Sequence, residues 1–107
     1  MKKAKVYFKS ELAGILAEND QGFEFTYFES YRELKGARAI SLTLPLRSQP
    51  YKSKVLFSFF DGLIPEGWLL DLAHDNWKFD MRDRMSILLL TCKDCIGAVS
   101  IEEALDE

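Results

Sequence analysis

The sequence has few residues of the kinds that perform chemistry. It contains one histidine and two cysteines, which are too few ligands for a structural zinc site. His74 and Asp75 are neighbours, but adjacent residues of a helix point about 100° apart and do not share a catalytic site. Gly62 and Gly67 are too widely spaced for a phosphate-binding loop. We therefore expect no enzyme activity, no metal and no cofactor.

The two cysteines leave one chemical alternative open. Cys92 and Cys95 form the Cys-x-x-Cys sequence "CKDC". A redox role needs such a pair at a helix N-terminus after a strand, whereas this pair follows a helical run and precedes the strand-like "IGAVSI". This order favours two reduced, half-buried thiols over a thioredoxin-like enzyme.

The sequence also lacks an excess of positive charge and a long apolar run. With 14 basic and 17 acidic side chains the net charge is -3, so we expect no direct binding of nucleic acid. Lys2, Lys3, Lys5 and Lys9 gather near the first predicted strand, where edge protection is favoured over a nucleic-acid footprint. No apolar run approaches the ~20 residues of a membrane span, and no signal-peptide core follows the first lysines. These absences predict a cytoplasmic protein without membrane contact.

What is present is a well-patterned chain for one domain. Its 107 residues suit a single core, and we treat residues 1–107 as one domain. Apolar residues make up 48%, and the 13% of aromatic residues is generous for this length. Some of this apolar surface is therefore expected to be covered by another protein.

The N-terminal third follows the period of a half-buried sheet. In Lys5–Lys9, Leu12–Ala17 and Phe23–Phe28 every second residue falls on the same face of a strand. In the second segment Leu12, Gly14 and Leu16 share one face. With the turn Asn19–Gly22 these segments predict a three-stranded antiparallel meander. Ser30–Ala39 reads as a connection with one helical turn. The alternation through Ile40, Leu42 and Leu44 predicts a short strand that ends at Pro45.

Helical periodicity then replaces the alternation. The first predicted helix has Ser53 as N-cap and Asp61–Gly62 as its C-terminal stop. Its apolar stripe is Val55, Leu56, Phe59, Phe60 and Leu63. A second helix is predicted from Pro65, a favoured first position, to about Asn76.

A third helix and a last strand complete the predicted α+β fold. Asp80 is the predicted N-cap, with Asp83 three residues on. The buried stripe of this helix is Met81, Met85, Leu88 and Leu89. Ile87 and Leu90 lie off the stripe, so we expect the helix to be covered on more than one side. Ile96–Ile101 predicts a buried strand, and the acidic end "EEALDE" is expected to fray.

The segment Phe59–Asp71, "FFDGLIPEGWLLD", places a tryptophan beside a Pro-Glu-Gly corner. On a helical wheel Trp68 lies about 60° to 100° to one side of the inner face that includes Leu69 and Leu72, at the rim of the buried surface. One interpretation is a core-edge tryptophan that fixes the second helix to the first. The other is an anchor for a partner, because tryptophan is enriched in binding hot spots.

Three ordered segments resemble a known family. They are "AISLTLPLRSQPY", "LFSFFDGLIPEGWLLDLA" and "DMRDRMSILLLTCKDCIGAVSI", and the matching residues are Ser41, Leu42, Leu44, Pro45, Leu46, Phe59, Phe60, Leu63, Pro65, Glu66, Gly67, Asp94, Gly97, Ala98 and Val99. Together they resemble the N-terminal subdomain of the HipA-like serine/threonine kinase toxins. Cys92 departs from the family, which often has glycine at this place. Because the chain stops at Glu107, where the kinase core would begin, the resemblance implies no kinase activity.

As a free-standing subdomain, the chain resembles the small HipS component of tripartite HipB-HipS-HipT systems. The resemblance implies an antitoxin that neutralises a HipT-like kinase, with a HipB-like protein supplying the DNA binding. Our hypothesis places the partner contact at Trp68 and its neighbours Asp61, Ile64, Pro65, Glu66, Gly67 and Asp71. The alternatives are a structural subdomain excised from a full-length HipA-like kinase and, last, a small cysteine-dependent enzyme.

Overall fold

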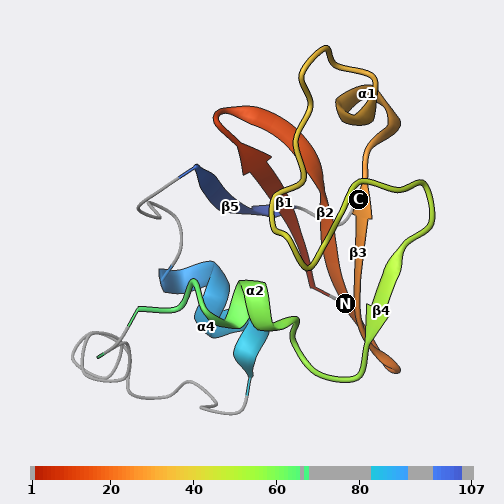
Figure 1. Ribbon diagram of the computed structural model, residues 1–107. Coiled ribbons are helices and arrows are strands. Elements are labelled where there is room, and N and C mark those ends of the chain that lie inside the picture. The colour runs from red at the N-terminus through yellow and green to blue at the C-terminus, as the bar shows by residue number, and fades with distance from the viewer. Residues whose placement is uncertain (1, 66, 68–82, 92–97, 105–107) are drawn as a thin grey trace.

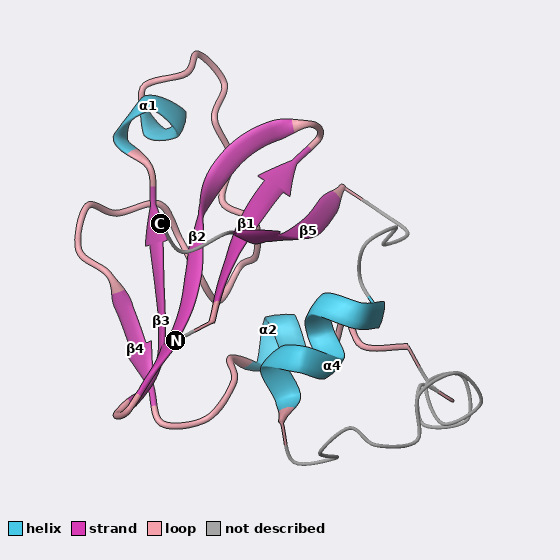
Figure 2. Cartoon of the chain, turned by 180° about the vertical axis from the view of Figure 1, so that it is seen from behind, coloured by secondary structure: helices cyan, strands magenta, loops and turns pink. Residues whose placement is uncertain are grey.

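The computed structural model describes residues 2–65, 67, 83–91 and 98–104, which form an α+β fold as predicted (Figure 1). The strands are β1 (Lys3–Phe8), β2 (Glu11–Asn19), β3 (Gly22–Tyr27), β4 (Tyr51–Ser53) and β5 (Val99–Ala104). They form one antiparallel sheet in the order β4-β3-β2-β1-β5. The helices of the described residues are α1 (Glu29–Arg32), α2 (Ser58–Asp61) and α4 (Arg84–Thr91). Figure 2 shows α2 and α4 together at one end of the sheet and α1 at the other.

The predicted meander is confirmed as β1-β2-β3, joined by two tight turns. Lys9 and Ser10 connect β1 to β2 with φ of 49° and 73°, the left-handed backbone that suits a two-residue hairpin turn. The amide of Lys9 donates to the carbonyl of Ala98 at 2.7 Å, which fixes this turn against the segment before β5. Gly22 begins β3 with φ of 131°, and a Cβ there would lie 2.2 Å from the carbonyl oxygen of Ser53.

A β-bulge interrupts the alternation that the sequence suggests for β2. The register of β1 against β2 shifts after Val6, which leaves Ala13 as the extra residue. Ala13 and Leu16 are buried, whereas Leu12 is 38% exposed. The predicted shared face of Leu12 and Leu16 is therefore wrong, because the bulge turns the first residues of β2 to the other side.

β5 covers the side of β1 that the sequence suggested was an edge. The two strands pair along their whole length, with Lys5 opposite Glu102. Opposite charges at facing positions stabilise such a strand pair. Because β5 lies along β1, the lysines of β1 do not protect an open edge of the sheet. The prediction that the acidic end frays is wrong for Glu102–Ala104, which belong to β5.

The predicted strand through Ile40 and Leu44 does not form, because the hydroxyl of Tyr27 engages its backbone. This hydroxyl accepts the amide of Ile40 at 3.0 Å and donates to the carbonyl of Leu44. Burial raises the pKa of Tyr27 to about 12, so the hydroxyl stays protonated and able to donate. The chain instead makes a tight turn between Ser41 and Leu44, and Leu42 at its tip is fully exposed.

β4 and α2 also differ from the prediction for this segment. Ser53 lies in β4, which pairs with β3, and is not the N-cap of a helix. α2 is a single turn with Phe57 as N-cap and Gly62 as C-cap, and the stop at Gly62 is as predicted. Val55 is 70% exposed, so its place on the buried stripe was wrong. A strand as short as β4 carries too little alternation to be recognised.

α4 has the predicted inner face but a later start. Within the described residues α4 begins at Arg84, and the side chain of Asp83 caps it. The buried residues are Met85, Ile87, Leu88 and Leu89. Of the two residues off the predicted stripe, Ile87 is buried as expected, whereas Leu90 is 43% exposed, so the expectation of a wider cover holds for Ile87 alone. β5 likewise begins at Val99, later than predicted.

The core lies between the sheet and the two helices. Its largest fully buried side chains are Phe25, Phe60, Leu16, Met85, Ile87, Leu88, Ile101 and Val6. Phe60 of α2 contacts Phe25 of β3 edge to face, with 5.5 Å between ring centroids. This contact joins α2, and so the start of the corner that follows it, to the sheet.

Some predictions lie outside the described residues. They concern most of the second helix, His74, Asp80, Met81, Cys92, Asp94, Cys95, Ile96, Gly97 and the last three residues. Within the described residues, no helix is long and apolar enough to cross a bilayer.

Candidate functional site

The corner after α2 is built by two successive turns that end the helix. The amide of Leu63 donates to the carbonyl of Phe60 at 3.0 Å, and that of Ile64 donates to the carbonyl of Asp61 at 3.2 Å. Pro65 cannot donate an amide hydrogen, so this pattern ends there. These bonds fix the path of the chain after α2, and Phe60, whose carbonyl accepts the first of them, is itself held in the core.

The structure describes four of the seven predicted contact residues. Ile64 is partly buried and packs against the core, so part of its side chain serves the fold. Pro65 and Gly67 are exposed, and Gly67 has φ of 79° with open space around its Cβ position. The other three residues, Glu66, Trp68 and Asp71, lie outside the described residues.

Asp61, the fourth described residue, forms an ion pair that the sequence did not reveal. The guanidinium of Arg84 donates to one carboxylate oxygen of Asp61 from Nε at 2.9 Å and from Nη2 at 2.5 Å. The side chains of Asp61 and Arg84 are 47% and 34% exposed. The pair joins the end of α2 to the start of α4, so Asp61 has a role within the domain. No local sequence pattern identifies a pair separated by 23 positions.

The start of α4 carries a second charged contact. The carboxylate of Asp83 accepts the amide of Ser86 at 3.1 Å and its hydroxyl at 2.8 Å, which is the geometry of an N-cap. The ammonium of Lys2 also donates to this carboxylate and ties the N-terminus to α4. Burial alone would raise the pKa of Asp83, but the bonds from Lys2 and Ser86 outweigh it and hold the pKa below its ordinary value.

Replacing Asp83 by alanine is therefore expected to destabilise the domain in a pH-dependent way. At neutral pH the loss should be about 1 kcal/mol, the usual value of an N-cap. Because the folded-state pKa is lowered, the contribution is present above the ordinary value of 3.8 and is lost as the pH falls through the folded-state pKa.

Urea unfolding of Asp83→Ala and of the native chain, at neutral pH and near pH 3, measures this difference. Glu33→Ala is the matched control, since Glu33 is an exposed carboxylate just after α1. A constant difference between the two pH values would mean that folding does not favour the ionised form of Asp83.

Two loops near the start of α2 present apolar side chains to solvent. Leu42 stands at the tip of the Ser41–Leu44 turn and Val55 in the segment before α2. A shallow hollow of about 240 Å³ lies between these loops, with Val55, Leu56 and Phe57 in its lining. Exposed apolar groups around a hollow are typical of a protein-binding surface. The sequence pattern missed this surface because it predicted inward positions for Val55.

The described part of the chain contains few features of a metal-binding or catalytic site. No group of three or more His, Cys, Asp or Glu side chains there could hold a metal ion. Among the described residues, the two side chains with shifted pKa values are Tyr27 and Asp83, and both hold parts of the fold together. The corner can therefore position side chains for contact, and its described residues supply no base or nucleophile that is placed for catalysis.

Comparison with known proteins finds similar proteins by sequence and by structure. The family model described as the HipA N-terminal domain matches residues 4–102. A solved structure, described as the N-terminal domain of HipA toxin, matches with a TM-score of 0.76 and 27% identity, covering 100% of this chain and 96% of that one. An uncharacterised protein of Haemophilus influenzae is 33% identical over 103 residues, which are 96% of this chain and 93% of that protein.

Proposed function

Because this chain belongs to the HipA N-terminal domain family, we propose that it is an antitoxin that binds a HipA-like serine/threonine kinase and blocks its activity. The observation that carries this proposal is the length of the Haemophilus relative, which aligns over 93% of its own sequence. That relative is therefore almost entirely this domain. A domain of this kind that forms almost a whole protein by itself is suited to act as a separate regulator of a kinase.

The kinase that we propose as partner is HipT-like and takes this domain in trans. The corner supports this mode of binding, because α2 and the Asp61–Arg84 pair hold it while Pro65 and Gly67 stay at the surface. The exposed Val55 and its hollow extend the contact area. In a complete system a HipB-like protein would bind DNA in the same complex, and the complex would act in the cytoplasm.

A second candidate is a structural subdomain of a full-length HipA-like kinase. The match to the N-terminal domain of the HipA toxin favours it. The two candidates differ in the reading frame beyond Glu107. A stop codon there supports the separate antitoxin, and continuation into a kinase core supports the subdomain.

Co-expression with a HipT-like kinase encoded beside this chain tests the proposal. We expect the two proteins to co-purify, growth to recover from the toxicity of the kinase, and phosphoryl transfer by the purified kinase to fall when this chain is added. A kinase variant without its catalytic aspartate controls for toxicity unrelated to phosphorylation. Failure to bind, or binding without any recovery of growth, would overturn the antitoxin function.

A further inference from the structure

A second hollow lies at the opposite end of the molecule from the corner, beside α1. It measures about 500 Å³, within the ~300–1,000 Å³ of typical ligand-binding pockets. Its apolar lining comes from Phe8, Tyr31, Leu34 and Ala37. Leu34 is 43% exposed, so an apolar group that enters the hollow would remove this side chain from water.

The walls of this hollow are fixed by hydrogen bonds within the domain. The hydroxyl of Tyr31 donates to the carbonyl of Arg38 at 2.6 Å, and the amide of Ala37 donates to the carbonyl of Leu34 at 3.1 Å. On the other side, the turn at Lys9 is held by the carbonyl of Ala98. A binding site that is already formed loses little conformational entropy when it is occupied.

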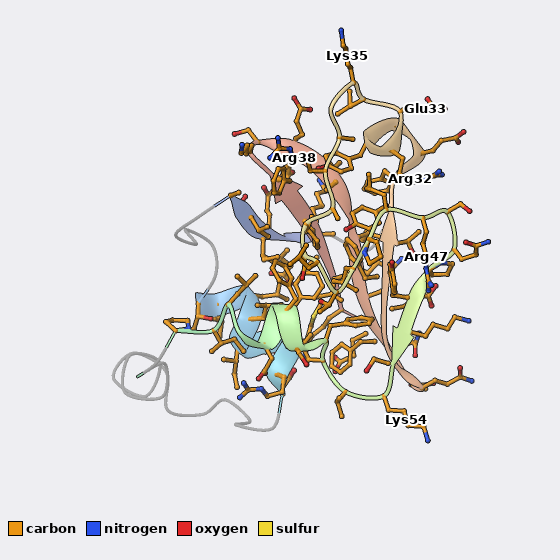
Figure 3. All side chains as sticks on the ribbon, viewed as in Figure 1. Arg32, Glu33, Lys35, Arg38, Arg47 and Lys54 are labelled. Carbon is orange, nitrogen blue, oxygen red and sulfur yellow. The ribbon has the colours of Figure 1, made fainter. Side chains whose placement is uncertain are left out.

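The charge at this hollow is opposite to that of the whole chain. Lys9, Lys35 and Arg38 line it with one carboxylate, Glu11, although the chain carries a net charge of -3. Lys35 and Arg38 are exposed, and neither forms an ion pair with another described residue. Figure 3 shows Lys35 extended from the tip of the loop, with Arg38 further along the same loop.

Arg47, another labelled cation, is engaged differently (Figure 3). Arg47 stacks on the ring of Tyr51 at 3.6 Å and donates to the carbonyls of Gln49 and Pro50 at 3.0 and 2.9 Å. Arg47 therefore stabilises the residues just before β4. The side chains of Lys35 and Arg38 have no such task in the described part of the chain, so their charges are available to a ligand.

We propose that this hollow is a second binding surface, which receives an acidic segment of a partner protein with an apolar side chain between its carboxylates. The apolar side chain would enter beside Leu34 and Tyr31, and its flanking carboxylates would meet Lys35 and Arg38. This surface lies at the other end of the sheet from α2, so it can be occupied together with the corner.

A blocked Glu-Glu-Phe-Glu-Glu peptide provides a direct probe that does not depend on any kinase. In an NMR titration of the full chain we expect the amides of residues 31–38 to shift. A peptide with lysines in place of the glutamates, and one with alanine in place of the phenylalanine, should bind at least about tenfold more weakly.

Variants of the protein locate the site. Lys35→Glu and Arg38→Glu should each weaken the peptide about tenfold, since each change replaces an attraction by a repulsion. Leu34→Ala should weaken it by removing the apolar contact. Lys54→Glu is the matched control, because Lys54 is exposed at the far end of the molecule and carries the same change of charge (Figure 3). This control should retain the affinity of the native chain within about twofold.

Three results would overturn the proposal. The first is the absence of shifts at residues 31–38 with the acidic peptide. The second is equal weakening by Lys54→Glu, which would indicate general electrostatic attraction without a site. The third is binding of a short single-stranded oligonucleotide at these residues when the peptide does not bind, which would assign the surface to nucleic acid. A partner kinase that fails to bind the chain would refute the antitoxin function and leave the peptide test intact.

Discussion

Replacing Phe60 by alanine is expected to lower the free energy of unfolding by about 3–5 kcal/mol, the usual cost of truncating a buried phenylalanine. Phe60 is 0% exposed. Its ring contacts Phe25 of the sheet and the neighbouring Phe57 and Phe59, with centroids 5.2 to 6.2 Å apart. The deletion would leave a cavity between β3 and α2 that a single-turn helix cannot close. For a domain of this size the loss is a large part of its total stability.

Urea unfolding followed by circular dichroism measures this effect. Leu42→Ala is the matched control, because Leu42 is fully exposed and its truncation should change the stability by less than about 0.5 kcal/mol. A Phe60→Ala chain as stable as the native one would show that the packing between the sheet and α2 contributes little to the fold.

The sheet could be predicted where the pattern is local. Phe23, Phe25 and Tyr27 alternate without interruption, and they form β3 as the sequence indicates. The bulge at Ala13 could not be predicted in the same way, because an extra residue in one strand is visible only against its partner. In the same way, the pairing of β1 with β5 depends on segments from the two ends of the chain.

The segment around Leu44 shows how a tertiary contact overrides a local pattern. Its alternation is that of a strand, and yet two of its backbone groups bond to one hydroxyl from β3. A hydroxyl that is both donor and acceptor can replace the ladder contacts that a strand would need. The residues from Ile40 to Leu44 give no sign in the sequence that they bond to Tyr27, which lies 13 to 17 positions away.

The turn at the candidate site could be predicted from its residues, but the ion pairs that hold the helices beside it could not. The proline and glycines of the corner mark a turn from the sequence alone. The Asp61–Arg84 and Lys2–Asp83 contacts span 23 and 81 positions, so they follow from the fold and not from spacing. They hold the end of α2 and the start of α4 in place.

Replacing Trp68 by alanine is expected to weaken binding of a HipT-like kinase at least about thirtyfold, the effect of losing a hot-spot side chain. Tryptophan has a large apolar surface and few rotatable bonds, so its burial against a partner costs little entropy. The corner begins from a defined direction, since Phe60 is buried and Asp61 is held by Arg84. Calorimetric titration with a catalytically inactive kinase measures the affinity.

The unfolding free energy of the same variant separates the two roles considered for Trp68. An anchor predicts a large loss of affinity with the stability unchanged within about 1 kcal/mol. A core-edge residue predicts the reverse, because truncation of a packed tryptophan costs about 3–5 kcal/mol of stability. Trp68→Phe is the conservative control and should keep part of the affinity, since it retains an apolar ring. If Trp68→Ala binds the kinase as tightly as the native chain, the principal contact lies elsewhere, and the exposed apolar surface at Leu42 and Val55 becomes the next place to test.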